Sequence, residues 1–442
     1  MPNDMPNAFA QWQQRLAARG LVAGQSRTGE SGRSAPLYRP LRLPQGMSEL
    51  QVRRTLRGME SQAGELPLFR GAGAYRHAIP QAVETVASRW AVDVACNHSL
   101  TEENQGLLQA LWEYQALLCR LTGMDRAALG ASDGAAACAQ AMLCLRAVTG
   151  KSKILVSAGL HPEYRRVLDS SARFAGIELR TLPLNKNGIT DMGHLMASAQ
   201  GAAGAILQSP NFFGCVEALG PAAEILHESK ALLAACVNPL SLGLLHRPGD
   251  VAADLCVGEG QPLGIPLRLG GPYLGLVTAK QAYGDHLPGW RVIQKPDHQG
   301  FALVQPGKER EGLHPAAVQN VLANSLCALR AAAYLAIMGG QGLRDVAWQS
   351  MQKAHYLKDG ILSIPGMGLR YPHAPFFHEF VVEGPKDPAV INAALRAKGY
   401  VGGLRIARYI PQDRGILYCA TEMNTREEID GLLNALEEVC CK

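Results

Sequence analysis

The sequence predicts an α/β protein in which a large domain, built on a mostly parallel sheet, precedes a small C-terminal α+β domain. Two observations support this prediction. Residues 152–279 contain five short, continuous apolar runs with helix-like segments between several of them: "SKILVSAGL", "GAAGAILQS", "LLAACVN", "DLCVGE" and "YLGLVTA". Such runs are typical of strands in a sheet that helices cover on both faces. After a long apolar helix, a strand–helix–strand–helix pattern then continues to the C-terminus.

These patterns divide the chain into an N-terminal helical and linker segment (1–68), the large α/β domain (69–338) and the small domain (339–442). At 442 residues the chain is long enough for two or three domains with a large buried core. No internal repeat interrupts this division.

The N-terminal segment combines helical and linker-like stretches. Residues 9–21 have helical spacing, and residues 23–34 form a polar linker of small residues. The next stretch, "MSELQVRRTLRGME", predicts a helix with Ser48 as its N-cap and with Leu50, Val52 and Leu56 on its apolar side. The following "GAGAY" (71–75) predicts a tight turn where this segment joins the large domain.

The C-terminal half begins with the long apolar helix over residues 316–338, which "GGQG" should interrupt. A second helix is expected over "DVAWQSMQKAHYLKDGIL". The small domain should then contain strands at "FFHEFVVEG" and "GILYCATE", a helix at "DPAVINAALRAKG" and a final amphipathic helix at "TREEIDGLLNALEEVC".

Composition excludes several classes of protein. The formal net charge of +5 is spread along the chain without a basic block, so nucleic acid is not an expected partner. Charged residues make up 18% of the chain, which favours a protein that buries part of its exterior against a partner. No stretch is expected to span a bilayer, and a cytoplasmic location is expected because no secretory signal is visible.

The cysteines and histidines do not predict a disulfide framework or a metal site. No Cys or His cluster has zinc-ligand spacing, and His373 with His378 lacks a third ligand. Most of the eleven cysteines sit in apolar segments, where buried free thiols are expected: Cys96, Cys119, Cys138, Cys144, Cys236, Cys256 and Cys327.

A large α/β domain, a long helix and a small C-terminal domain resemble the plan of pyridoxal-phosphate (PLP) enzymes of fold type I, the aspartate aminotransferase type. Such enzymes need a helix N-terminus for the phosphate, an acidic residue for the pyridine nitrogen and a lysine for the Schiff base. Here "GASDGAAACAQAM" places Asp133 near the helix N-terminus, where a carboxylate caps the helix but repels a phosphate. Asn238 stands where the acid is expected. In place of the lysine, "VGEGQPLG" offers Glu259 and Gln261.

The chain contains no lysine between Lys230 and Lys280. Because each of the three requirements is unmet, the sequence predicts a degenerate cofactor site around Asp133, Asn238, Glu259 and Gln261. An autonomous PLP enzyme is therefore disfavoured.

A closer resemblance runs from about Tyr38 almost to the end. It rests on "LPLFRGAGAYRHAIP", "LQALWEYQALLCRLTGMD", "HPEYRRVL", "QSPNFFG", "NPLSLGLL", "VGEGQPLG", "GGPYLG", "QKAHYL" and "GILYCATEMNTREEID". In these motifs the chain resembles the alpha subunits (subunit 1) of two-subunit glycine decarboxylases, the P-proteins of the glycine cleavage system.

The resemblance implies a subunit that is inactive without a beta-type partner, in a heterodimer or an α2β2 complex. The beta partner would supply the lysine and bind PLP. The complex would decarboxylate glycine and pass the aminomethyl group to a lipoyl carrier, the H-protein. In such enzymes the alpha chain walls the pocket and lacks the lysine as a normal trait.

The sequence departs from the family pattern in three places. Residues 96–106, "CNHSLTEENQG", replace a Tyr- and Pro-rich run that resembles a lid on the shared site. Within residues 308–325, "LHPA" stands in place of a basic run. Asn238 stands where the family commonly has Asp. Two alternatives therefore stay open: a paralogue that acts on a different amino acid with its own beta-like partner, or a non-catalytic scaffold subunit.

Candidate functional residues follow from these segments. The candidates for proton transfer or substrate contact are Glu102, Gln105 and His98, although solvated loop positions explain His98 equally well. Four further residues are expected to face substrate or partner: Asn97, Asn211, Arg291 and His314. For Asn211 a turn-stabilising role is an equal alternative, and exposed arginines such as the one expected at position 291 usually bind neither substrate nor carrier.

Overall fold

The computed structural model describes residues 46–63, 66–96, 104–295, 300–304 and 319–441. The chain divides into two compact units, Met1–Gly64 and Glu65–Lys442. In the first unit the expected helix is present as α2 (Glu49–Ala63). Ser48 is its N-cap: the Gln51 amide donates to Ser48 Oγ (3.3 Å), and the Gln51 side chain accepts from the Ser48 amide (2.9 Å). This reciprocal capping box fixes where α2 begins.

The second unit contains a seven-stranded sheet in the order β1-β7-β6-β5-β4-β2-β3. Strands β2 to β6 are parallel, whereas β7 pairs antiparallel with β6 and with β1. The bounds are β1 (Arg126–Ala127), β2 (Lys153–Ser157), β3 (Glu178–Leu182), β4 (Gly204–Ser209), β5 (Leu232–Val237), β6 (Leu255–Glu259) and β7 (Gly275–Ala279). The five predicted apolar runs are thus five of these strands.

Helices cover both faces of this sheet, because the strand residues alternate between two separate cores. Ile154, Ile206 and Ala234 pack with helices α5 and α6. Their neighbours Leu155, Leu207 and others pack with α7 and α8. The helices are α3 (Gln81–Cys96), α4 (Gln105–Thr122), α5 (Gly134–Thr149), α6 (Pro162–Ala175), α7 (Met192–Ala199) and α8 (Leu219–Glu228). The expected doubly covered sheet is therefore confirmed.

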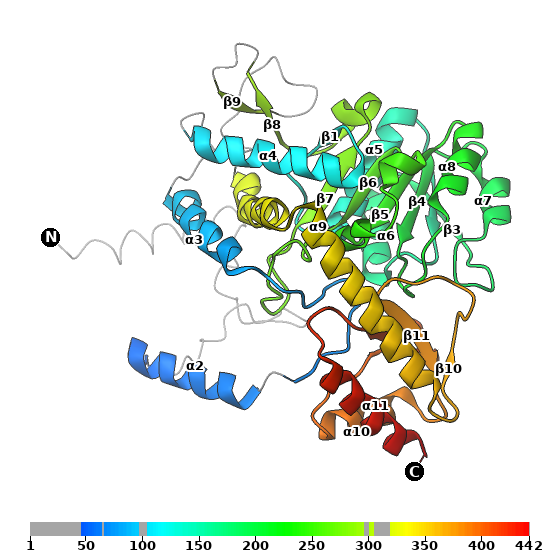
Figure 1. The fold of residues 1–442 in the computed structure, drawn as a ribbon. Coiled ribbons are helices and arrows are strands. Elements are labelled where there is room, and N and C mark those ends of the chain that lie inside the picture. Colours follow the sequence, from blue (N-terminus) through cyan, green and yellow to red (C-terminus); the bar gives the residue numbers. More distant parts are fainter. Residues whose placement is uncertain (1–45, 64–65, 97–103, 296–299, 305–318, 442) are drawn as a thin grey trace, which may run out of the picture. The chain divides into compact units, whose positions relative to one another are not determined.

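Helix α9 (Gln319–Leu362) links this layer to the C-terminal part (Figure 1). It packs against α3 and α4 at one end and against α11 at the other. Gly339 has non-helical dihedral angles (φ 59°, ψ −172°), so the break expected at "GGQG" is a kink between two helical halves. A short ribbon of β8 (Arg291–Gln294) and β9 (Phe301–Val304) lies beside α4.

The small C-terminal part is a four-stranded antiparallel sheet in the order β10-β11-β13-β12, with two helices. Its elements are β10 (Gly368–Leu369), β11 (Glu379–Glu383), α10 (Pro388–Ala397), β12 (Leu404–Arg405), the 3-10 helix η5 (Ile406–Arg408), β13 (Ile416–Cys419) and α11 (Arg426–Cys441). The N-terminal stretch joins this part: the Phe69 amide donates to Val401 O (2.9 Å), and the Cys419 amide donates to Phe69 O (3.1 Å).

Two sequence-based expectations change in detail. By length and composition the helical segment Asn324–Leu362 is long and apolar enough to cross a bilayer, so the expectation that no stretch qualifies is wrong on that criterion. Its residues Ala328, Leu329 and Tyr334 are buried in the hydrophobic core, as expected for the core helix of a folded domain. The cysteines whose side chains are described are free thiols, and most of them are buried.

Candidate functional site

The carboxyl ends of β5 and β6 and the N-terminus of α5 meet at one edge of the large sheet. This is where open α/β sheets bind ligands, because loops diverge beyond the strand ends. The predicted degenerate site lies here: Asp133 caps α5, Asn238 follows β5, and Glu259 ends β6. Three segments that are distant in sequence are therefore brought together as expected.

Glu259 places its carboxylate on the N-terminus of α5. Its Oε2 accepts from the Gly134 amide (2.9 Å), which is the first amide of that helix. Its Oε1 accepts from the amides of Gln261 (2.9 Å) and Leu274 (3.3 Å). A helix N-terminus favours an anion through its free amides and its dipole. In this chain an internal carboxylate already occupies that position.

A second carboxylate completes this arrangement. Asp133 Oδ1 accepts from the Ala136 amide (2.8 Å), and Ser132 Oγ donates to Asp133 Oδ2 (3.1 Å). Burial is the largest influence on the pKa of Glu259 and raises it, the three amide donors lower it, and the nearby Asp133 charge raises it slightly; together they bring this pKa to about 7. Any additional anion at this helix end would face both carboxylates.

The space above the helix end is also filled by side chains. A Cβ on Gly134 would lie 2.4 Å from Tyr164 Oη and 3.1 Å from Glu259 Cβ. A Cβ on Gly73 would lie 3.4 Å from His161 Nε2, which itself contacts Ala72 O at 3.0 Å. The chain's own turn and aromatic residues therefore close over the edge of the sheet.

Gln261 holds that turn in place. Its Oε1 accepts from the Tyr75 amide (2.8 Å), and its Nε2 donates to Tyr75 O (2.9 Å) and Ile265 O (2.8 Å). On the far side of the turn, Glu379 accepts from the Ala72 amide (2.6 Å) and from Tyr75 Oη (2.7 Å). The turn predicted at residues 71–75 is thus fixed by side chains from both parts of the unit, and the buried Gln261 amide has all of its groups bonded.

Asn238 makes a neutral end to β5. Its Oδ1 accepts from the Leu240 amide (3.1 Å), so its Nδ2 is the donor facing His378 Nε2 at 3.3 Å. His378 is almost fully buried, and burial together with the nearby His77 holds its pKa well below the usual histidine value. A neutral amide beside a neutral imidazole offers no negative charge for a protonated ring nitrogen.

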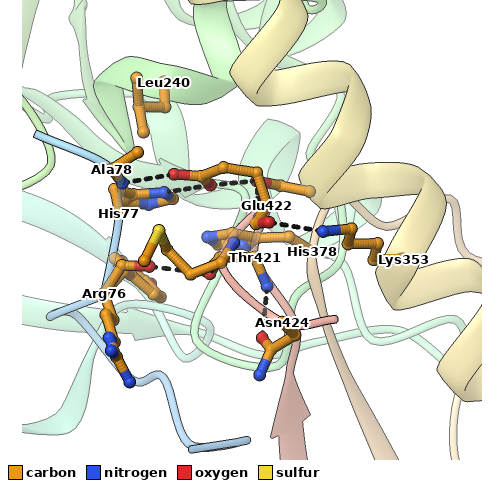
Figure 2. Close-up of polar contacts among 12 residues, drawn as sticks. Arg76, His77, Ala78, Leu240, Lys353, His378, Thr421, Glu422 and Asn424 are labelled. Atoms are coloured by element: carbon orange, nitrogen blue, oxygen red, sulfur yellow. Dashed lines mark hydrogen bonds and ion pairs between the residues drawn. The ribbon is translucent and has the colours of Figure 1, made fainter. Parts of the chain in front are cut away.

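A second polar cluster connects residues 76–78, which precede α3, to helix α9 and the small sheet (Figure 2). Glu422 accepts from the Ala78 amide (2.7 Å) and contacts His77 Nδ1 (2.8 Å). Ser350 Oγ also donates to this carboxylate (3.0 Å), and Lys353 Nζ donates to the Glu422 backbone carbonyl. These bonds connect residues 77–78, helix α9 and the segment after β13. They therefore hold the chain that directly follows the turn at residues 71–75.

Two further candidates, Gln105 and Arg291, lie at the β8–β9 ribbon and its contact with α4. Gln105, in the first turn of α4, is bonded to β9: its Oε1 accepts from the Phe301 amide (2.7 Å), and its Nε2 donates to Phe301 O (3.1 Å). Arg291 is buried in β8 beside Asp285 (3.0 Å), not exposed as its sequence context suggested. Their proposed catalytic and partner-facing roles stay predictions.

Asn211 is buried in the turn after β4. Its Oδ1 accepts from the amides of Phe213 and Cys215, and its Nδ2 donates to Gly188 O and to Glu217. This geometry agrees with the turn-stabilising alternative. The other predicted residues lie outside the described parts of the chain: Asn97, His98, Glu102 and His314. Among the described residues, no group of three or more His, Cys, Asp or Glu side chains is placed to hold a metal ion.

Sequence reasoning missed four residues that build this edge: His161, Tyr164, Tyr75 and Glu379. His161 and Tyr164 lie in "HPEYRRVL". The proline in this motif is typical of the first turn of a helix, but no local pattern shows which residues the two side chains contact. Glu379 sits in an apolar strand, and a buried carboxylate inside such a strand is itself an unusual signal.

Comparisons with known proteins agree with this architecture. The family model described as "Glycine cleavage system P-protein" matches residues 33–436. "Probable glycine dehydrogenase (decarboxylating) subunit 1" of Moorella thermoacetica is 41% identical over 98% of this chain and 99% of its own length. The protein of the same name from Desulfitobacterium hafniense is 36% identical over 99% of this chain and 100% of its own length.

Solved structures give the same assignment. The crystal structure titled "glycine decarboxylase (P-protein) of the glycine cleavage system, in inhibitor-bound form" has a TM-score of 0.80 and 36% identity, and the match covers 91% of this chain and 92% of that chain. The apo structure of mouse CSAD shares the fold alone, at 16% identity and a TM-score of 0.68 over 90% of this chain and 89% of that chain. The chain therefore belongs to the glycine cleavage system P-protein family, as an alpha-type (subunit 1) member with the PLP fold type I architecture.

Proposed function

We propose that this chain is the subunit of a glycine decarboxylase that does not bind PLP, and that a beta-type partner binds the cofactor and completes the active site. The relatives named as glycine dehydrogenase (decarboxylating) subunit 1 support the reaction and imply a second subunit. The main support for this division of roles is the hydrogen bond between the Glu259 carboxylate and the first amide of α5.

The residues of this chain do not fit PLP. A phosphate would have to displace Glu259 from Gly134 and remain beside Asp133. The ring nitrogen would face Asn238, and no lysine occurs between residues 230 and 280 to form a Schiff base. The turn at residues 71–75 and Tyr164 also fill the volume above the helix end. When bound to the partner, PLP would supply the electron sink for decarboxylation.

This chain's own contribution is then structural support for the shared site. Hydrogen bonds and packing fix the sheet edge, the turn and the small sheet relative to one another, which would give the partner a rigid surface. Glycine as substrate follows from the names of the relatives, whereas the lipoyl H-protein as carrier follows from the family resemblance. A heterodimer or an α2β2 complex is the expected assembly.

The test is carbon dioxide exchange into glycine. The chain alone should give no exchange above buffer, whereas the chain mixed with its beta-type partner and a lipoylated carrier protein should give exchange. Exchange by the isolated chain would overturn the proposal.

Two further results would favour the alternatives. A reconstituted pair that exchanges with another amino acid but not with glycine would identify a repurposed paralogue. A pair that assembles but exchanges with no amino acid would identify a scaffold subunit.

A further inference from the structure

Four arginine side chains gather on one surface of the small C-terminal part. Arg70 follows Phe69, whose backbone bonds to Val401 and Cys419 of this part. Arg396 lies in the last turn of α10, Arg405 ends β12, and Arg408 ends η5. All four residues reach solvent, although the Arg70 guanidinium is partly buried. Arg70 and Arg405 line two adjoining depressions, of about 410 and about 270 Å³, so these two side chains lie between them.

The charges in this cluster are not neutralised within the described part of the chain. None of the four guanidinium groups there forms an ion pair or a hydrogen bond with a carboxylate. Burial lowers the pKa of Arg70, and repulsion by Arg408, Arg405 and Arg396 lowers it further, with no carboxylate acting in the opposite direction. Arg408 has an aromatic neighbour, since its guanidinium lies 5.6 Å from the centre of the Tyr409 ring.

Two other cations of the same small part are paired with carboxylates. Arg370 binds both Glu383 and Asp413, and Lys398 binds Glu438 (2.7 Å). The small part therefore supplies acidic partners for some of its cations, but none for the four arginines of the cluster within the described residues. Four like charges that repel one another destabilise the folded protein slightly unless an anion neutralises them.

The backbone beneath the cluster is held by ladder bonds. The Phe69 amide bonds to Val401 O next to Arg70, and β12 pairs with β13 in the register Arg405↔Ile416. Arg396 projects from α10, which the buried residues Ile391 and Leu395 attach to the core. The backbone at Arg70, Arg396 and Arg405 is thus held in place, so that a ligand has to order only the side chains when it binds.

We propose that these four arginines form a binding site for a small molecule that carries two phosphate groups, with one group in each depression and with Arg70 and Arg405 shared between them. Guanidinium groups bind phosphate oxygens through paired N–H donors, and arginine suits this geometry better than lysine. Arg396 and Tyr400 line the larger depression, and Arg408 lines the smaller one. The site adjoins the sheet edge described above, since Arg70 precedes the turn at residues 71–75 and the Tyr409 ring lies 5.9 Å from that of His161. None of the four arginines belongs to that edge, and the proposal does not rest on the proposed decarboxylase function.

The concave shape favours a small molecule over an acidic protein surface. The two depressions together are of the size of a small-ligand site, whereas the docking of an acidic protein face does not require them. The probes are therefore inorganic pyrophosphate, which offers the two phosphates alone, and ADP, which adds a nucleoside that could stack on Tyr400.

The experiment is calorimetric titration of the full chain with each probe at a fixed ionic strength of about 0.15 M, with sulfate as a single-anion reference. Saturable pyrophosphate binding should weaken at least tenfold in Arg70→Ala/Arg405→Ala, because these two side chains line both depressions and would contact both phosphates. The matched control is Arg166→Ala/Arg173→Ala on α6, which removes the same charge from another surface and should change the affinity less than twofold. Thermal unfolding of each variant checks that it is folded.

Single variants assign the two depressions. Arg396→Ala and Arg408→Ala should each weaken pyrophosphate several-fold and leave sulfate binding to the opposite depression intact. Tighter binding of ADP than of pyrophosphate would identify a nucleotide as the source of the phosphates, and equal binding would identify the diphosphate group alone. Failure of both probes to bind saturably would overturn the proposal, as would an equal loss of affinity in the control. Binding of an acidic polypeptide without binding of pyrophosphate would also overturn it.

Discussion

Glu259→Gln tests whether a buried carboxylate occupies the α5 N-terminus. Glu259 is only 8% exposed to solvent, and its pKa is raised from 4.5 to about 7. Between these two values the folded protein binds a proton that the unfolded chain does not bind. The contribution of Glu259 to stability therefore falls as pH rises through this interval, and it does not change further above it.

The size of the effect follows from the two pKa values. We integrate the difference in proton binding between the folded state (pKa about 7) and the unfolded state (pKa 4.5) from pH 5 to pH 8. The wild type loses about 2.5 kcal/mol of stability over this range. Glutamine does not titrate, so Glu259→Gln lacks this loss. For a compact unit of this size, about 1–2 °C of melting temperature per kcal/mol gives a difference of roughly 3–5 °C.

The assay is thermal unfolding of both proteins at pH 5, 6, 7 and 8 in constant salt. Because Glu379 is also buried and its pKa is also raised to about 7, both proteins should share a pH dependence from that residue. The informative quantity is the difference between their slopes. Glu224→Gln, which removes an exposed glutamate on α8, controls for the loss of charge alone. Equal slopes for Glu259→Gln and the wild type would show that Glu259 is not a buried, perturbed carboxylate.

Three further perturbations test the surrounding structure. Gln261→Ala removes three buried hydrogen bonds and should lower the unfolding free energy by about 2–4 kcal/mol in urea, whereas an effect below 0.5 kcal/mol would show that the turn at residues 71–75 does not depend on it. Asn211→Ala should cost about 3 kcal/mol by the same measurement, because four hydrogen bonds are lost and Glu217 loses a donor; a neutral result would contradict the turn-stabilising role. His378 should stay neutral at pH 6 in NMR spectra, and its depressed pKa means that stability is lost as pH falls through and below 6.5; a normal titration near 6.5 would show that the ring is hydrated.

The fold was largely predictable because its elements have strong local signals. The continuous apolar runs became β2, β4, β5, β6 and β7, and the break at "GGQG" became a kink at Gly339. The capping role of Ser48 was predictable because serine is a preferred N-cap residue before an amphipathic run, and in the structure its partner is Gln51, three residues later. Signals of this kind depend on a few neighbouring residues, so one sequence is sufficient to find them.

The candidate site was predictable only by what it lacks. The absence of a lysine, the neutral Asn238 and the carboxylate at Asp133 are visible in the sequence, and they indicated a site that should not hold PLP. The destination of Glu259 was not predictable, because Gly134 lies 125 residues away and no local pattern specifies that contact. The same reason applies to Gln261 and Tyr75, which are separated by 186 residues.

Cofactor content tests the central claim most directly. The isolated chain, incubated with excess PLP and passed through a desalting column, should retain none and show no absorbance in the internal-aldimine region. The complex with its beta-type partner should retain one PLP for each beta chain and none for the alpha chain, and Glu259→Gln should not change that ratio. Stoichiometric PLP retained by the isolated chain would contradict the account, because it would show that a phosphate can displace Glu259 from the N-terminus of α5.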